Sequence, residues 1–155
     1  MIKEKSCGAI IYKDNKVLLI KHKAGHVSFP KGHVEGIETE EETAYREIFE
    51  ETGLMTQIDN GFRYVTTYSP KVSVIKDVVY FVATVIGGLE RPQLEEISDI
   101  IWVSRDDAVS LVTFDNDKKV LEMALKYIKE KYWIFFSIFY SVILTVLVIV
   151  SLLSS

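Results

Sequence analysis

The stretch Lys31–Leu54, KGHVEGIETEEETAYREIFEETGL, decides the fold because it holds the strongest helix of the chain with its start and stop signals. We predict a helix over Glu40–Thr52. Thr39 precedes it as an N-cap, and Glu42 three residues later completes a capping box. Gly53 follows directly, at the position where a left-handed residue commonly ends a helix. The segment therefore predicts one short helix that is fixed at both ends.

Three carboxylates are expected on one side of this helix. Glu47, Glu50 and Glu51 stand at i, i+3 and i+4, within an arc of roughly 100°. The apolar residues are expected opposite them, against a sheet: Ala44, Tyr45, Ile48 and Phe49. Because like charges repel, the cluster favours a hard cation such as Mg²⁺ or Mn²⁺. On helix geometry alone, a solvated acidic face remains the alternative.

Strands and helices alternate around this segment. We expect strands at Cys7–Tyr12, Lys16–His22, Gly61–Tyr68, Val72–Ile86 and Ser98–Val103, with a hairpin turn at Lys13-Asp14-Asn15. Further helices are expected at Asp106–Val112 and Asp115–Lys131. This order favours an α+β fold or a three-layer α/β/α sandwich.

Charge and cysteine content narrow the class of protein. The net charge of −4 argues against a general nucleic-acid binder, so no nucleic-acid partner is expected. A small phosphate-rich ligand remains possible, because a divalent cation can reverse the sign of an acidic site. The single cysteine, Cys7, excludes an internal disulfide and lies in an apolar run, so we interpret it as a core thiol rather than a nucleophile. Met1–Ser6 is charged, and no signal peptide is expected.

The C-terminal stretch Tyr132–Leu153 carries no charged residue. As a helix its 22 residues would extend roughly 33 Å, enough to cross a bilayer core. We expect a second part of the chain here, a transmembrane anchor over 132–153 after a globular domain over 1–131; a buried helix is the alternative. Lys126, Lys129 and Lys131 precede the stretch, which places the folded domain on the cytoplasmic side of the membrane.

The spacing within the opening stretch resembles a known family signature. Gly32, five residues, Glu38, seven residues and then Arg46–Leu54 match G-x₅-E-x₇-R-E-U-x-E-E-x-G-U, where U is a bulky aliphatic residue, at every defined position. This is the signature of the Nudix hydrolases. The resemblance implies an α/β/α sandwich with a mixed sheet that hydrolyses nucleoside diphosphates linked to another group, with Mg²⁺ or Mn²⁺ as cofactor.

The resemblance also implies roles for individual residues. The implied metal ligands are Glu47, Glu50, Glu51 and the backbone carbonyl of Lys31. Glu47 or Glu51 is expected to act as the catalytic base as well, and Arg46 to orient the carboxylates. Gly32, Glu38 and Gly53 are implied structural positions of the motif.

The chain resembles one branch of the family more closely than the others. Ser28–Glu35 is similar to the loop of the asymmetric diadenosine tetraphosphate hydrolases, which implies that Lys31 and His33 face the phosphate chain. His33 as an ordinary loop histidine is the alternative. The chain departs from the branch at Val27, where an aromatic residue is usual, and at Gly36-Ile37-Glu38.

Three more positions follow from that branch. Lys76 matches a strand lysine that contacts phosphates, and Phe114 matches an aromatic residue that stacks on adenine. Glu96 matches a further metal-binding carboxylate, with Glu95 as the competing candidate. From the residues alone, Lys76 could equally be a surface lysine and Phe114 a core residue.

The expected function is Mg²⁺-dependent cleavage of a nucleoside polyphosphate, with a dinucleoside tetraphosphate split into ATP and AMP as the leading case. The alternatives within the family are removal of pyrophosphate from RNA 5′ ends and hydrolysis of nucleoside triphosphates or inositol pyrophosphates. A non-catalytic nucleotide sensor at the membrane is the alternative of a different class. The intact carboxylate set favours an enzyme.

Overall fold

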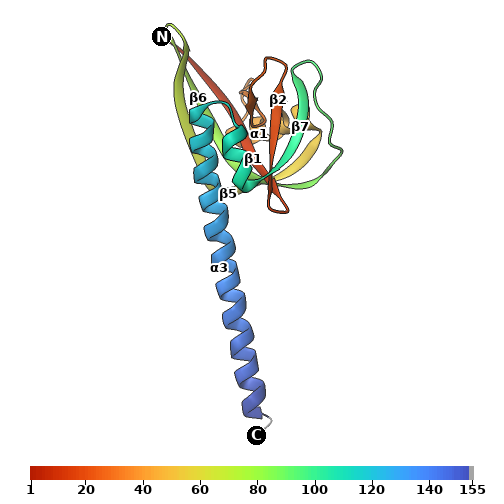
Figure 1. The fold of residues 1–155 in the computed structure, drawn as a ribbon. Coiled ribbons are helices and arrows are strands. Elements are labelled where there is room, and N and C mark those ends of the chain that lie inside the picture. The colour runs from red at the N-terminus through yellow and green to blue at the C-terminus, as the bar shows by residue number, and fades with distance from the viewer. Residues whose placement is uncertain (154–155) are drawn as a thin grey trace. The chain divides into compact units, whose positions relative to one another are not determined.

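The computed structural model describes residues 1–153, which form a mixed sheet with helices on both faces and a long C-terminal helix (Figure 1). The elements are β1 (Ile2–Lys13), β2 (Lys16–His22), β3 (Val27–Ser28), β4 (Lys31–His33), α1 (Glu40–Thr52), β5 (Leu54–Lys71), β6 (Val74–Gly88), β7 (Ile97–Ser104), α2 (Arg105–Leu111) and α3 (Asp115–Leu153). The expected α/β/α fold with a mixed sheet is confirmed.

The sheet divides at β1. Its main path runs β3-β2-β1-β6-β5, with β4 paired to β1 and β7 paired to β2. Along one edge, β1 runs parallel to β6 from Ile2 to Tyr12. Along the other edge it pairs with β4 at Cys7 and with β2 only at its far end. Because β4 and β2 share one edge of β1, the sheet opens between them, and β4 is brought under α1.

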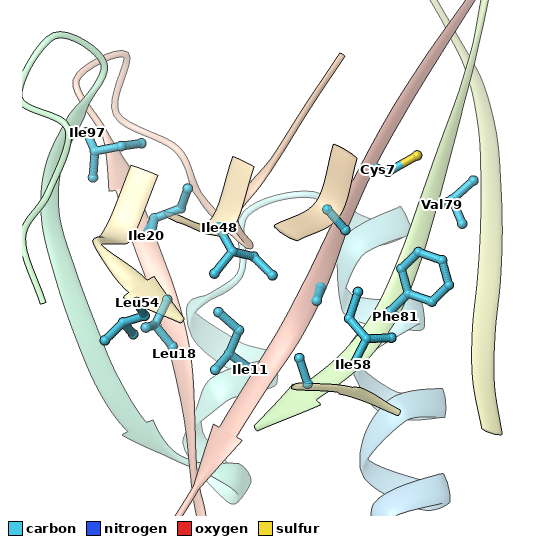
Figure 2. Packing of buried hydrophobic residues seen from close by; sticks show 13 residues of the cluster. Cys7, Ile11, Leu18, Ile20, Ile48, Leu54, Ile58, Val79, Phe81 and Ile97 are labelled. Carbon is cyan, nitrogen blue, oxygen red and sulfur yellow. The ribbon is translucent and has the colours of Figure 1, made fainter. Parts of the chain in front are cut away.

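Successive side chains of β1 point to opposite faces of the sheet, and from Ser6 to Tyr12 both sets are buried. Cys7, Ala9 and Ile11 belong to one cluster with Ala44 and Ile48 of α1. Figure 2 shows Ile48 among the side chains of this cluster. Burial on both faces explains why the strand reads as a continuous apolar run.

The opposite face is covered by α2 and by the first turns of α3. Buried Tyr80 of β6 donates a hydrogen bond to Asp117 of α3 at 2.8 Å. Val120 and Leu121, one turn further along α3, are fully buried. Two helical layers therefore enclose the sheet within the first 124 residues.

Helix α1 begins and ends where the sequence predicts. Thr39 and Glu42 form both hydrogen bonds of the capping box. Gly53 closes the helix at φ 72°, and its N–H donates to the Phe49 carbonyl at 2.8 Å. A Cβ at Gly53 would overlap the Leu89 carbonyl, so the glycine is required by space as well as by φ.

The buried face of α1 differs from the expectation. Ala44 and Ile48 are fully buried, but Tyr45 and Phe49 are 37% and 46% exposed, so their expected packing against the sheet is wrong. Glu51 takes part in the buried face instead. The reason is angular, because Glu51 lies closer to the Ala44–Ile48 line around the helix than Phe49 does.

Two strands are longer than expected. β1 begins at Ile2 rather than Cys7, and β5 runs from Leu54 to Lys71 rather than beginning near Gly61. The β5–β6 pairing contains three irregularities, and such bulges let one strand bend without ending. The outer part of β5 is largely exposed, so burial imposes little alternation on its sequence.

The chain divides into two compact units, Met1–Ala124 and the residues from Leu125 onward. α3 crosses this division without interruption and continues to Leu153, beyond the expected helix end at Lys131. Its apolar stretch is exposed along its length, which disfavours the buried-helix alternative. By length and composition alone, the stretch is able to cross a membrane.

We predict that Ile48→Ala lowers the free energy of unfolding by about 2–5 kcal/mol, because it removes a fully buried side chain between α1 and the sheet. Denaturant unfolding of the detergent-solubilised full chain, followed through Trp102 fluorescence with Trp133→Phe in every variant, measures the change. Ile37→Ala is the matched control, because Ile37 is 102% exposed. Equal stability of the two variants would contradict the proposed core.

Candidate active site

A cavity of about 680 Å³ lies in the first unit, over the motif residues. Ten residues singled out in the sequence line it: Lys31, Gly32, His33, Arg46, Glu47, Glu50, Glu51, Lys76, Glu96 and Phe114. Glu95, the competitor of Glu96, is not among the lining residues. Glu38 and Gly53 are not among the lining residues.

Arg46 connects the acidic side chains at this site by donating hydrogen bonds to three glutamates. Its Nε and one terminal nitrogen donate to the two oxygens of Glu38 at 2.7 and 2.9 Å. Its other terminal nitrogen donates to Glu47 at 2.7 Å and to Glu50 at 3.1 Å. A further bond reaches the His33 carbonyl at 2.8 Å. Arg46 therefore fixes two carboxylates of α1 and also ties the helix to β4.

Glu38 holds Arg46 in this orientation. Its hydrogen bonds from Arg46 lower the pKa of the Glu38 carboxyl to about 2, and bonds from the Glu35 backbone and Thr43 add to the effect. The bidentate geometry is the strong form of an arginine–carboxylate pair. Glu38 thus holds the guanidinium group of Arg46 through two hydrogen bonds.

The absence of a side chain at Gly32 lets Glu47 reach β4. A Cβ built there would overlap the carboxyl group of Glu47. Burial raises the pKa of Glu47, while the hydrogen bond from Arg46 opposes the shift. The Glu47 carboxylate is therefore held against the β4 backbone in a partly desolvated position.

Glu51 is the most buried of the three carboxylates, at 4% exposure. Its Oε2 accepts a hydrogen bond from the Lys31 backbone N–H at 2.9 Å. Burial raises the pKa of Glu51, the Lys31 backbone N–H and charge oppose the shift, and with smaller increases from Glu47 and Glu96 the pKa is about 8. The three glutamates share one cavity but differ in burial: Glu51 is buried, Glu47 is half-buried and Glu50 is exposed.

The opposite charge is supplied by two lysines. Lys31 comes from β4 and Lys76 from β6, and both line the cavity. Burial lowers the pKa of Lys76, with the positive charge of Lys31 as the next cause. His33 also lines the wall, and its Nε2 lies 3.3 Å from a carboxylate oxygen of Glu4. The cavity is therefore acidic along α1 and cationic where β4 and β6 face it.

Phe114 is 51% exposed and lines the cavity, so the alternative of a buried core residue is wrong. Its ring contacts that of His26, with centroids 5.4 Å apart and planes tilted by 49°. An exposed aromatic face beside a polar cavity can accept the face of a planar ring. This position is compatible with contact to a nucleobase.

The segment between β6 and β7 is tied to the end of α1. The Gln93 N–H donates to the Glu51 carbonyl at 3.1 Å, and the Arg91 N–H donates to the Thr52 carbonyl at 2.8 Å. These bonds bring Glu96 to the same cavity as Glu51, although forty-odd residues separate them. No local pattern around Glu96 reveals this approach.

Several lining residues have no counterpart in the sequence analysis: His22, His26, Tyr68, Tyr80, Gln93 and Asp117. Tyr80 and Asp117 are buried and hydrogen-bonded to each other, although they come from β6 and α3. In the sequence, only the two closely spaced histidines before Ser28, His22 and His26, could have pointed to these additional lining residues.

The donor set suits a hard divalent cation. Glu47, Glu50 and Glu51 each use one oxygen in the hydrogen bonds described above, and within residues 1–153 the other oxygen of each accepts none. In that same part of the chain, however, no three acidic, histidine or cysteine side chains converge closely enough to hold a metal as they stand. Arg46 keeps Glu47 and Glu50 turned toward itself, so small side-chain rotations would be needed for coordination.

Comparison with known proteins agrees with the motif. A family profile described as NUDIX domain matches residues 3–124. The chain is 33% identical over 138 residues to the bis(5′-nucleosyl)-tetraphosphatase [asymmetrical] of Rattus norvegicus, covering 76% of this chain and 90% of that protein. It is 44% identical over 85 residues to an ADP-ribose pyrophosphatase of Methanocaldococcus jannaschii, covering 51% of this chain but only 49% of that protein.

Other relatives are also matched over part of their length, such as the 8-oxo-(d)GTP phosphatase of Mycolicibacterium smegmatis, of which 30% is covered at 34% identity. Among solved structures, the binary complex of a C. elegans Ap4A hydrolase superimposes with a TM-score of 0.74 at 22% identity. That match covers 82% of this chain and 98% of the other, and it supports the fold.

We predict that Glu38→Gln flattens the loss of thermal stability at acid pH. The pKa of Glu38 is lowered to about 2 from 4.5, so its ionised form stabilises the fold above about pH 4.5 and this contribution disappears as the pH falls through about 2. Melting curves across that range, with exposed Glu41→Gln as control, measure the effect. A Glu38→Gln profile parallel to that of the wild type would show that the Glu38–Arg46 pair does not stabilise the fold.

Proposed function

The chain belongs to the Nudix family, and from this premise we propose that it is a Mg²⁺-dependent hydrolase that splits a dinucleoside tetraphosphate into ATP and AMP. The observation that carries the proposal is the division of charge in one cavity, with the glutamates of α1 along one part and two lysines along another. A polyphosphate chain needs cationic groups for its oxygens, and hydrolysis needs a carboxylate beside the attacked phosphorus. The relationship to asymmetric tetraphosphatases over 76% of the chain supports this substrate class.

Binding and orientation are assigned to the cationic groups. Lys31 and Lys76 neutralise phosphate oxygens, and His33 donates to the same chain from the neighbouring strand. Phe114 offers its exposed ring to one nucleobase. Together these groups would hold the phosphate chain between the base platform and the carboxylates of α1.

Proton transfer is assigned to the carboxylates. Glu47 or Glu51 accepts a proton from the attacking water, and the new P–O bond forms as the bond to the leaving phosphate oxygen breaks. Arg46 keeps Glu47 in place through the 2.7 Å hydrogen bond between them. The products are ATP and AMP, so the added water is fully accounted for, and no covalent enzyme intermediate is required.

The cofactor would be held by Glu47, Glu50, Glu51 and Glu96 together with the Lys31 carbonyl. Mg²⁺ bound by such oxygen ligands supplies charge neutralisation and lowers the pKa of a coordinated water; Mn²⁺ suits the same ligands. Partial desolvation of Glu47 and Glu51 favours a positive charge beside them.

Replacement of Glu51 tests the proposed hydrolysis. With Mg²⁺ and diadenosine tetraphosphate, the full chain in detergent is expected to yield ATP and AMP in equal amounts, resolved by anion-exchange chromatography. Glu51→Gln should reduce the rate by about 10²–10⁴-fold, because it removes a ligand and candidate base. Glu41→Gln on the exposed side of the same helix is the control.

Cleavage of a different substrate would indicate another activity within the Nudix family. Release of pyrophosphate from triphosphorylated RNA, or cleavage of nucleoside triphosphates or inositol pyrophosphates in place of the tetraphosphate, would refute the proposed substrate. Tight nucleotide binding without any product from these substrates would support a sensor instead of an enzyme.

We further propose that the apolar part of α3, residues 132–153, anchors the domain over 1–131 to a membrane from the cytoplasmic side. The stretch is uncharged, helical and exposed along its length. Tyr132 and Trp133 stand at its start, where aromatic residues favour the bilayer interface. Lys126, Lys129 and Lys131 precede it on the side assigned to the cytoplasm.

This anchor predicts how the protein fractionates. The full chain should sediment with membranes and remain there after a high-salt or alkaline wash, whereas a chain ending at Lys131 should stay in the supernatant. In intact cells or right-side-out vesicles, the domain should be protected from added protease. A full chain that washes off the membrane, or a domain that is digested, would contradict the anchor or its orientation.

A further inference from the structure

Two histidines form a stack that the proposed function does not use. His22 ends β2, and His26 stands in the loop that follows; their ring centroids are 4.0 Å apart and the planes differ by only 16°. His26 in turn contacts the ring of Phe114. All three rings line the cavity, so one continuous aromatic array reaches from the base platform toward β2.

The inner end of this array is connected to Lys31 through one hydroxyl. His22 Nε2 lies 2.9 Å from the Oγ of Ser28, and the Lys31 ammonium lies 3.1 Å from the same oxygen. Ser28 is fully buried, so its hydroxyl has to find its hydrogen-bond partners within the protein. A single buried hydroxyl therefore joins a histidine to the lysine that faces the phosphate chain.

The direction of these hydrogen bonds follows from the chemistry of each group. A lysine ammonium can only donate, so Ser28 Oγ accepts from Lys31. The single hydroxyl hydrogen then has two possible acceptors, His22 Nε2 at 2.9 Å and the Phe29 carbonyl at 3.4 Å. The shorter distance is the normal one for an O–H donor, whereas 3.4 Å is beyond the usual range.

The charge state of His22 agrees with this direction. Burial, followed by the neighbouring His26 and Lys31, lowers the pKa of His22 to about 4. His22 is therefore neutral at physiological pH, and a neutral imidazole offers one unprotonated nitrogen as an acceptor. The arrangement requires the tautomer that carries its proton on Nδ1 and leaves Nε2 free.

We propose that His22 is a positioning residue that holds the Ser28 hydroxyl as an acceptor for Lys31 and thereby aims the Lys31 ammonium at the polyphosphate chain of the substrate. Without an acceptor at His22, the hydroxyl hydrogen is left with the Phe29 carbonyl at 3.4 Å, so Ser28 Oγ is held less firmly in the orientation that accepts from Lys31. A long, flexible lysine that is fixed in advance loses less side-chain entropy when a phosphate binds. The identification of the ligand as a polyphosphate rests on the proposed function. The hydrogen bonds that connect Lys31, Ser28 and His22 do not depend on it.

Kinetics on the full chain in detergent test the role. His22→Phe keeps a ring to stack on His26 but has no acceptor, and Ser28→Ala removes the bridging hydroxyl. Each should raise KM for diadenosine tetraphosphate about three- to tenfold, the size of one orienting hydrogen bond, and leave kcat within about twofold, since ground-state positioning is affected. Ser28→Thr should restore the wild-type KM, and Ser110→Ala, which removes an exposed hydroxyl outside the cavity, is the matched control.

The double variant is the decisive measurement. If His22 acts through Ser28, then His22→Phe with Ser28→Ala should raise KM no more than Ser28→Ala alone. Multiplicative increases in KM, or a fall in kcat with KM unchanged, would overturn the proposal. Such a result would show that His22 contributes to the site without this hydroxyl.

Two readouts separate this inference from the substrate assignment. Imidazole nitrogen NMR should show His22 as the Nδ1–H tautomer with a hydrogen-bonded Nε2, and Ser28→Ala should remove that bond; a proton on Nε2 would overturn the proposal. If the wild type fails to cleave diadenosine tetraphosphate, the proposed function fails. Binding of inorganic tripolyphosphate with Mg²⁺ then decides the positioning role, because equal affinity of the wild type and His22→Phe would refute it.

Discussion

The structure depends on holding three like charges together against a strand backbone. Glu47 and Glu51 are partly or almost wholly removed from water; Glu47 shares the Arg46 guanidinium with Glu38 and Glu50, and Glu51 accepts a hydrogen bond from the Lys31 backbone N–H. Such a cluster costs stability when it stands alone, because burial and mutual repulsion both oppose ionisation. The rest of the first unit supplies what offsets that cost: a bidentate Arg46–Glu38 pair, a glycine at position 32 and a helix capped at both ends.

The sheet topology explains why this arrangement is rigid. Because β1 pairs with β6 along one edge and shares the other between β4 and β2, its first half carries β4 directly beneath α1. Glu40 adds a second attachment at the helix start, through ion pairs to Lys5 at 2.8 Å and to Arg63 at 2.7 Å. Hydrogen bonds from Arg63 and Lys5 lower the pKa of Glu40 to about 2. The start of the helix, at the end remote from Gly53, is thus attached both to β1 and to β5.

The amino-acid sequence predicted the parts that local chemistry determines. The bounds of α1 and both caps follow from spacing within one segment. Seven of the ten expected residues in the cavity come from that segment, and the resemblance to one branch of the family pointed to the other three, Lys76, Glu96 and Phe114. The sequence failed for Tyr45 and Phe49, whose exposure follows from their angular position around the helix. It also failed for the extent of β5, which pairing with the distant strand β6 decides. Asp117 and His22 were missed for the same reason, since their partners lie on other elements and no periodic pattern marks them.

A protein with a net charge of −4 can still bind a polyanion, because its positive and negative side chains occupy different parts of the cavity. The glutamates occupy one helix, and the lysines reach the same cavity from two strands. Where a third positive charge could form, at His22, burial keeps the imidazole neutral and leaves it an acceptor. A charged His22 would repel Lys31 and compete with it for the Ser28 hydroxyl. The neutral ring therefore makes the lysine the sole cation bound at Ser28 within residues 1–153, so its charge remains directed at the cavity.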